Sequence, residues 1–277
     1  MFNTNVITPI EEYNNIYYKR DDLYTPFFPE PLNGGKVRQC ITLIETNLEK
    51  IKTEHGGTVA TITSINSPQG IIVSRVCKEF GLKCIIGVGG QGINKNNICD
   101  EIRNNGGEIV TLSRMAYDNV LYVKLLELEK TRNINFFKIK LGINVSDSDE
   151  LRDCISNQVV NIPEDTENII IPTGSGIVAG SVLYGLKQLN RNHKVYVVQI
   201  AGYDRTKTIN NICSDYPYEY IAYKKYSYAR KLKIFITPTF QLDSVYESKG
   251  YDWMKININT DKEKTLFWCV GNASMHR

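Results

Sequence analysis

Segments with the pattern of buried strands alternate with amphipathic helices along most of this sequence, and this alternation limits the possible folds more than any other feature. Apolar runs of strand length lead into helix-like segments, and glycines close several of these helices. Because parallel strands need a helical crossover between them, the pattern predicts an α/β protein with parallel sheets. The expected helices are 35–50, 71–80, 98–105, 117–132 and 176–189, and the expected strands are 58–63, 83–88, 108–112, 168–172, 194–200 and 265–270.

The alternating segments divide into two groups. Three strands and their helices fit a compact parallel-sheet unit between roughly residues 48 and 145, and a second unit follows it. The stretch 216–231 is rich in Tyr and Lys. We interpret this stretch as a solvated helix face, and a basic aromatic surface that stacks nucleobases is the alternative.

The composition argues against several classes of protein. A net charge of +3, from 33 basic and 30 acidic residues, indicates neither a nucleic-acid partner nor an anionic membrane. No apolar run reaches the roughly 20 residues that span a bilayer, and residues 1–9 lack a signal-peptide pattern. The seven cysteines form no CxxC pair and the three histidines have no ligand spacing. This predicts buried reduced thiols, no metal site and a cytoplasmic location.

A glycine-rich loop lies between the strand 168–172 and the helix 176–189. Glycines allow close approach of an anion to the backbone, and the free N–H groups at a helix start point toward it. The loop therefore predicts a phosphate site, although it lacks the Lys-Ser/Thr of a nucleotide triphosphatase. The residues of this site are Gly174, Ser175, Gly176, Ile177 and Val178.

The same loop also matches the dinucleotide fingerprint G-x-G-x-x-A, which ends at Ala179. That motif requires an acidic residue near the end of the next strand, and Asp204 is an approximate fit. A nicotinamide-dependent oxidoreductase is therefore one alternative function. A plain tight turn with a helix cap is the structural alternative.

Two segments near the start carry a more specific signal. Residues 18–23 read Y-K-R-D-D-L, and residues 32–38 read L-N-G-G-K-V-R, in which Lys36 follows two glycines. They resemble K-R-D-D-L and G-G-N-K-x-R-K-L of the 1-aminocyclopropane-1-carboxylate (ACC) deaminase and D-cysteine desulfhydrase family. These are fold-type-II enzymes of the tryptophan synthase β-like superfamily, which use pyridoxal 5′-phosphate (PLP). Further similar segments follow in order at 63–70, 80–84, 174–176 and 243–249.

The resemblance implies a role for each matched residue. Lys36 forms the Schiff base with PLP, and residues 174–178 hold its phosphate. Tyr246 lies near the ring and substrate as a catalytic residue, and Glu247 faces the pyridine nitrogen. The substrate-binding residues are Ser67, which also has a catalytic role, Gln69 and Tyr246.

The chain departs from the family pattern around the substrate. Gly35 replaces the family's Asn before the lysine, and the C-terminal T-G-G is lost. One register puts Pro68 at the position of the asparagine that binds the 3′-oxygen of PLP, and another gives this role to Asn66. Both registers stay open. These changes affect the expected substrate more than the expected cofactor.

By resemblance we expect two parallel-sheet, three-layer domains with the active site in the cleft between them. Residues 1–47 and 146–277 form the larger, cofactor-binding domain, and 48–145 the smaller. The leading function is a lyase or deaminase acting on a small amino acid, in a homodimer. A decarboxylase or lyase for a larger amino compound, such as an amino acid attached to a nucleobase, and an inactive binding protein are the alternatives.

Overall fold

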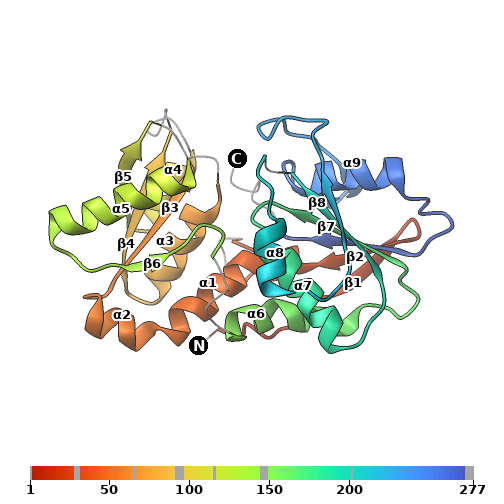
Figure 1. Cartoon of the computed structure of the whole chain (residues 1–277), viewed down its shortest axis with the longest axis horizontal. Coiled ribbons are helices and arrows are strands. Elements are labelled where there is room, and N and C mark those ends of the chain that lie inside the picture. The colour runs from red at the N-terminus through yellow and green to blue at the C-terminus, as the bar shows by residue number, and fades with distance from the viewer. Residues whose placement is uncertain are drawn as a thin grey trace. The chain divides into compact units, whose positions relative to one another are not determined.

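The chain folds into two compact units in the computed structural model, which describes residues 2–27, 32–64, 67–90, 97–114, 117–143, 149–200 and 202–271 (Figure 1). The first unit comprises Met1–Gln39 and Val145–Met275. The second comprises Cys40–Asn144 with His276–Arg277. The boundary between the units falls within helix α1 (Gly35–Thr46), so Lys36, on its first turn, belongs to the first unit.

The first unit is built on a six-stranded sheet with the order β1-β2-β12-β7-β8-β9. Only β1 is antiparallel to its neighbour among these described strands, and the other pairs are parallel. Every residue of β7 and β12 is buried, as expected of strands covered on both faces. The strands are β1 (Ile10–Tyr13), β2 (Ile16–Arg20), β7 (Asn168–Thr173), β8 (Lys194–Gln199), β9 (Glu219–Ala222) and β12 (Thr265–Cys269).

Separate apolar cores cover the two faces of this sheet. Ile169 and Ile171 of β7 pack with helices α6 (Asp149–Ser156), α7 (Ile177–Gln188) and α8 (Thr206–Ile212). Ile170, between them, points to the opposite face and packs with α9 (Glu247–Asn257). Near these helices lie the 3₁₀ turns η1 (Asp21–Leu23) and η3 (Asn157–Asn161) and the hairpin β10 (Phe235–Thr237) and β11 (Phe240–Gln241).

The second unit has a four-stranded parallel sheet with the order β5-β4-β3-β6. Ile62 and Ile85 on one face pack with α5, whereas Gly70 of α3 approaches Ile86 and Thr63 on the other. Both units are thus three-layered, and the predicted fold class is confirmed. The elements are α2 (Leu48–Glu54), β3 (Thr58–Ser64), α3 (Gln69–Glu79), β4 (Lys83–Gly89), α4 (Asn97–Asn104), β5 (Gly107–Ser113), α5 (Asp118–Arg132) and β6 (Phe137–Ile139).

Two segments differ from the sequence prediction. The helix expected at 35–50 is interrupted at Asn47, whose side-chain amide donates to the carbonyl of Leu43 at 2.9 Å and competes with the helical pattern. The stretch 216–231 is not a helix: it contains β9 and an irregular segment. Its tyrosines and isoleucine favour pairing with β8 over helix formation.

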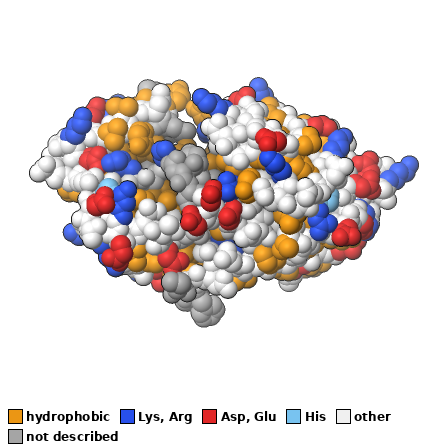
Figure 2. All heavy atoms as spheres, turned by 60° about the horizontal axis from the view of Figure 1, so that its bottom comes forward, with side chains coloured by type: hydrophobic (Ala, Val, Ile, Leu, Met, Phe, Trp, Pro, Cys, Tyr) orange, Lys and Arg blue, Asp and Glu red, His pale blue; other side chains and the backbone are white. Residues whose placement is uncertain are grey.

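The surface and the thiols agree with the composition. All seven cysteines are buried, as predicted. Basic and acidic side chains are interspersed over the face shown in Figure 2, so this face carries no large patch of one charge sign. Within the described ranges, no helix is both long and apolar enough to cross a membrane.

Gly185 provides a test of the packing of α7. A Cβ at this position would lie 2.3 Å from the carbonyl oxygen of Ser156, so Gly185→Ala should destabilise the protein by about 1–3 kcal/mol although alanine favours helices. Gly202→Ala, in the same unit, meets nothing within 4 Å and should change stability by less than about 0.5 kcal/mol. Urea unfolding measures both, and equal stabilities of the two variants would contradict this packing.

Candidate active site

The loop between β7 and α7 has the geometry of an anion site. Gly176 adopts φ +84° and precedes α7, and its N–H donates to Thr173 Oγ1 at 3.1 Å. A Cβ on Gly174 would lie 2.7 Å from the ring of Tyr246, and one on Gly176 would lie 3.1 Å from Arg205 Cβ. Only glycine therefore leaves room for these neighbours, while the first N–H groups of α7 have no acceptor within the helix.

Helix α1 begins beside the start of α7. A Cβ added to Gly35 would meet Val178 Cγ2 at 3.8 Å and Asp21 Oδ2 at 2.8 Å. The carboxylate of Asp21 thus occupies the space next to the position where the family carries asparagine. Asp21 is held by a fully buried ion pair with Arg38, at 3.1 Å, which fixes the first turns of α1.

Lys36 lies on this first turn with its side chain partly buried. Desolvation, and then the positive charge of Arg205, lower the pKa of the Lys36 amine to about 8. Among the described residues its Nζ has no hydrogen-bond acceptor. The amine therefore exists partly in the neutral, nucleophilic form near physiological pH.

Two acids hold the start of α9. Asp243 Oδ1 accepts from the N–H groups of Val245 and Tyr246 at 2.9 and 2.7 Å, and Glu247 Oε2 accepts from the N–H of Asp243 at 2.8 Å. This reciprocal arrangement works like a capping box. It fixes the direction of the Tyr246 side chain.

Tyr246 connects α9 to the glycine loop. Its ring packs against Gly174, and its hydroxyl shares a 2.9 Å hydrogen bond with the hydroxyl of Tyr228. The buried amine of Lys249 donates to the carbonyls of Ser227 and Tyr228, both at 2.9 Å, and so holds the irregular segment in place. Sequence reasoning missed Tyr228; the Tyr-rich composition of 216–231 was the available signal.

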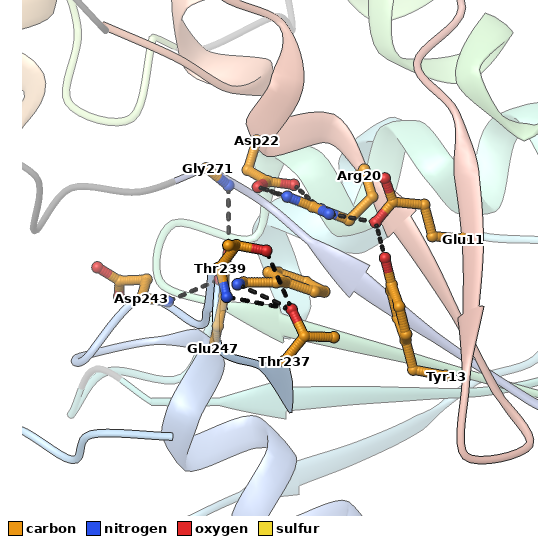
Figure 3. A network of polar contacts seen from close by, with 10 residues as sticks. Glu11, Tyr13, Arg20, Asp22, Thr237, Thr239, Asp243, Glu247 and Gly271 are labelled. Carbon is orange, nitrogen blue, oxygen red and sulfur yellow. Dashed lines mark hydrogen bonds and ion pairs between the residues drawn. The ribbon is translucent and has the colours of Figure 1, made fainter. Parts of the chain in front are cut away.

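Glu247 is buried within a network of charged groups (Figure 3). Its second oxygen, Oε1, accepts from the N–H of Gly271 at 3.1 Å. Burial, and then the carboxylates of Asp22 and Asp243, raise the pKa of Glu247. Asp22 is in turn bound by Arg20 at 2.9 Å. Glu247 therefore retains a proton more readily than an exposed glutamate.

Arg20 orders the outer part of this network. Its guanidinium pairs with Glu11 as well as Asp22 (Figure 3). The guanidinium also lies 3.6 Å from the centre of the Phe240 ring. Tyr13 donates to Glu11 at 3.1 Å. Because the arginine is largely buried and doubly paired, it keeps Asp22 near Glu247.

The remaining predicted residues belong to the second unit. Ser67 Oγ accepts from the N–H of Gln69 at 3.3 Å, at the start of α3. The buried amide of Gln69 bonds to Thr61 Oγ1, the carbonyl of Lys140 and the N–H of Gly142 at 2.8, 3.1 and 2.7 Å, which gives it a structural role. Substrate contacts of Ser67 and Gln69 remain predictions, and Asn66 lies outside the described residues.

No cluster of three or more potential metal-ligating side chains occurs in the described part of the chain. Histidine 193 is buried and its Nδ1 contacts the carbonyl of Thr166 at 2.7 Å, in a structural position. Among the described residues, Arg205 and Tyr246 lie at the glycine loop, and Lys36 lies on the neighbouring first turn of α1.

The environment of Lys36 leads to a pH prediction. In the free protein the amine should titrate near pH 8 rather than near 10.5, and Arg205→Met should raise this midpoint because it removes a repelling cation. Carbon-13 dimethylation of the lysines followed by NMR over pH measures the titration, with Lys36→Arg assigning the signal. Because the folded pKa lies below the unfolded value, this group makes the free protein more stable as pH rises from about 8 to 10.5. An ordinary lysine midpoint for this signal would contradict the geometry.

Comparisons with known proteins give similarities in sequence and in fold. No protein-family model matches the chain. A curated protein, "O-seryl-dTMP PLP-dependent decarboxylase" of Salmonella phage ViI, is 25% identical over 195 residues, which cover 64% of this chain. The match covers only 44% of the phage protein's own length.

Solved structures match nearly the whole chain. An ACC deaminase homologue superimposes with a TM-score of 0.76 at 18% identity, covering 97% of this chain and 90% of the other. A pyridoxal 5′-phosphate-dependent aspartate racemase gives a TM-score of 0.65 at 13% identity, covering 97% and 91%. The chain therefore has the fold of these solved structures, and the fold class expected from the sequence is confirmed.

Proposed function

We propose that this chain is a PLP-dependent enzyme in which Lys36 carries the cofactor and acts on an amino-acid substrate. One observation carries the proposal: an amine with a pKa of about 8 lies at the start of α1, beside the glycine loop of α7. Of the proposed cofactor residues, Lys36, Gly174–Val178 and Glu247 belong to the first unit, which we propose as the cofactor-binding domain.

The residues present fit the phosphate of PLP. Glycines at 174 and 176 bring Tyr246 and Arg205 close to the backbone of the loop, and the free N–H groups of Ile177 and Val178 at the start of α7 are suited to a dianion. We propose that the backbone of 174–178 binds this phosphate. Asp204, which the nicotinamide alternative requires, accepts from the N–H of Thr206 at 2.8 Å, and this capping role favours the PLP interpretation.

When bound, PLP supplies an electron sink for negative charge on the carbon next to the substrate amine. Lys36 would hold the cofactor through its amine and would move a proton at the substrate carbon, and both roles require the neutral amine. With a pKa of about 8, roughly a quarter of the amine is neutral at pH 7.5, against about one part in a thousand at the ordinary value.

The tyrosine pair supplies a second proton donor. The linked hydroxyls of Tyr246 and Tyr228 can pass a proton to or from a group held over Gly174. Glu247 is proposed as a third proton donor. Because the pKa of its carboxyl is raised, this group can provide a proton for a hydrogen bond to the pyridine nitrogen of PLP. Ser67 and the start of α3 are proposed to bind the substrate carboxylate.

A second, narrower candidate is decarboxylation of an amino acid carried on a nucleotide. It is supported by the similarity to the phage decarboxylase, whose name gives an O-seryl nucleotide as its substrate. The loss of the T-G-G, together with the Pro68 replacement that one of the two open registers gives, agrees with a substrate that differs from the free amino acids of the ACC deaminase family. Elimination or deamination of a small amino acid, the leading function expected from the sequence, is the other candidate.

Product analysis tests the function and the reaction together. The protein loaded with PLP is incubated with an O-seryl thymidine nucleotide, L-serine and D-cysteine, and carbon dioxide, ammonia and sulfide are measured. We expect carbon dioxide from the seryl nucleotide, and a loss of at least about a thousandfold in Lys36→Ala because the nucleophile is gone. Lys207→Ala, an exposed lysine of α8, is the control and should keep the parent's rate.

Ammonia or sulfide from the free amino acids would support the deaminase or desulfhydrase alternative. Equal rates for the parent and Lys36→Ala would contradict the proposed role of Lys36. Cofactor binding without any product from these substrates would support an inactive binding protein.

A further inference from the structure

Arg205 lies directly behind the glycine loop. It follows β8 and precedes α8, at the carboxyl end of the parallel strands, where α/β folds bind their ligands. Its Cβ lies 3.1 Å from the position of a Cβ on Gly176. Its N–H donates to the hydroxyl of Tyr220 at 3.0 Å, and its carbonyl accepts from Ile209 at 2.9 Å. The backbone of Arg205 is therefore fixed next to the loop.

Two cations converge at this point. The positive charge of Arg205 lowers the pKa of the Lys36 amine, and the Cβ of Arg205 lies beside Gly176, which precedes α7. An anion bound at the loop would be attracted by the positive charge of Arg205 as well as by the N–H groups at the start of α7. A single phosphate at the loop is already served by the N–H groups, so Arg205 adds capacity for further negative charge.

Tyr203 adds an aromatic surface beside this cation. Its side chain is 54% exposed, which is unusual for a large ring and leaves a face available for stacking. The guanidinium of Arg205 lies 5.6 Å from the centre of the Tyr203 ring. An exposed ring next to an arginine is the combination that binds a base and its phosphate in nucleotide-binding proteins.

We propose that Tyr203 and Arg205 form a subsite for the nucleotide part of the substrate, with the base stacked on Tyr203 and the phosphate bound by Arg205. This inference rests on the proposed function, in the form in which the substrate is an amino acid carried on a nucleotide, and it names the residues that bind the nucleotide. The recognised chemistry is a thymidine phosphate unit, which can come from a free nucleotide or from a DNA strand.

Binding measurements on the PLP-loaded protein test the subsite. Thymidine, thymidine 5′-monophosphate and a single-stranded thymidine trinucleotide are titrated by calorimetry into the parent and into Arg205→Gln, Tyr203→Ala and Tyr203→Phe. Lys207→Ala controls for the loss of a positive charge close to Arg205 in the sequence. PLP affinity of each protein is measured separately from the absorbance of the bound cofactor.

We expect Arg205→Gln to weaken binding of the monophosphate about tenfold or more and to leave thymidine binding unchanged, because a charge-assisted contact is lost. Tyr203→Ala should weaken both ligands by about tenfold, whereas Tyr203→Phe, which keeps the ring, should bind like the parent. Lys207→Ala should also match the parent. If the trinucleotide binds more tightly than the monophosphate, the thymidine phosphate unit belongs to a DNA strand. If the two bind equally, it belongs to a free nucleotide.

Three outcomes would overturn the subsite. In the first, the parent loaded with PLP binds neither the monophosphate nor the trinucleotide. Alternatively, Arg205→Gln would lose affinity for PLP and not for the nucleotide, which would assign Arg205 to the cofactor phosphate. A parent that binds no PLP at all would overturn the proposed function and this inference with it, and the absorbance measurement separates that case from the other two.

Discussion

The desolvated amine of Lys36 is the constraint on which the rest of the first unit depends. An ammonium group withdrawn from water loses its proton more easily, and a neighbouring guanidinium adds to that effect. The chain places this amine at a helix start where Gly34 has φ +93° and its Cβ would lie 2.6 Å from the carbonyl of Val270. A residue other than glycine would strain the turn that leads into α1. The buried Asp21–Arg38 pair then fixes the helix against the sheet.

The first unit contains a second lysine that clarifies what is special about Lys36. Burial also lowers the pKa of Lys19 to about 8. Its amine, however, donates to the carbonyl of Thr8 at 2.7 Å and to Asn161 Oδ1 at 2.8 Å, so it joins segments of the chain. Lys36 has no such acceptor in the described structure. A lowered pKa alone therefore does not identify a reactive lysine, and the local hydrogen bonds decide.

Much of the fold could be predicted because its central strands are continuous apolar runs between helices with clear periodicity. The hairpin β1–β2 was missed although Asn14 and Asn15, with φ of 52° and 61°, form the kind of two-residue turn that asparagine favours. The segment 216–231 was misread because Tyr and Lys occur on helix surfaces and edge strands alike. The glycine loop and Lys36 were found from local motifs. The positions of Arg205 and Tyr228 depend on contacts between distant segments, which no local pattern contains.

Chemical trapping of the cofactor tests the central claim most directly. The protein is mixed with PLP at pH 8, reduced with sodium borohydride, digested and analysed by peptide mass spectrometry. The account predicts a phosphopyridoxyl group on Lys36, and a marked loss of labelling at this position when inorganic phosphate competes for the loop. A label found instead on Lys19 or on exposed lysines, with Lys36 unmodified, would contradict it.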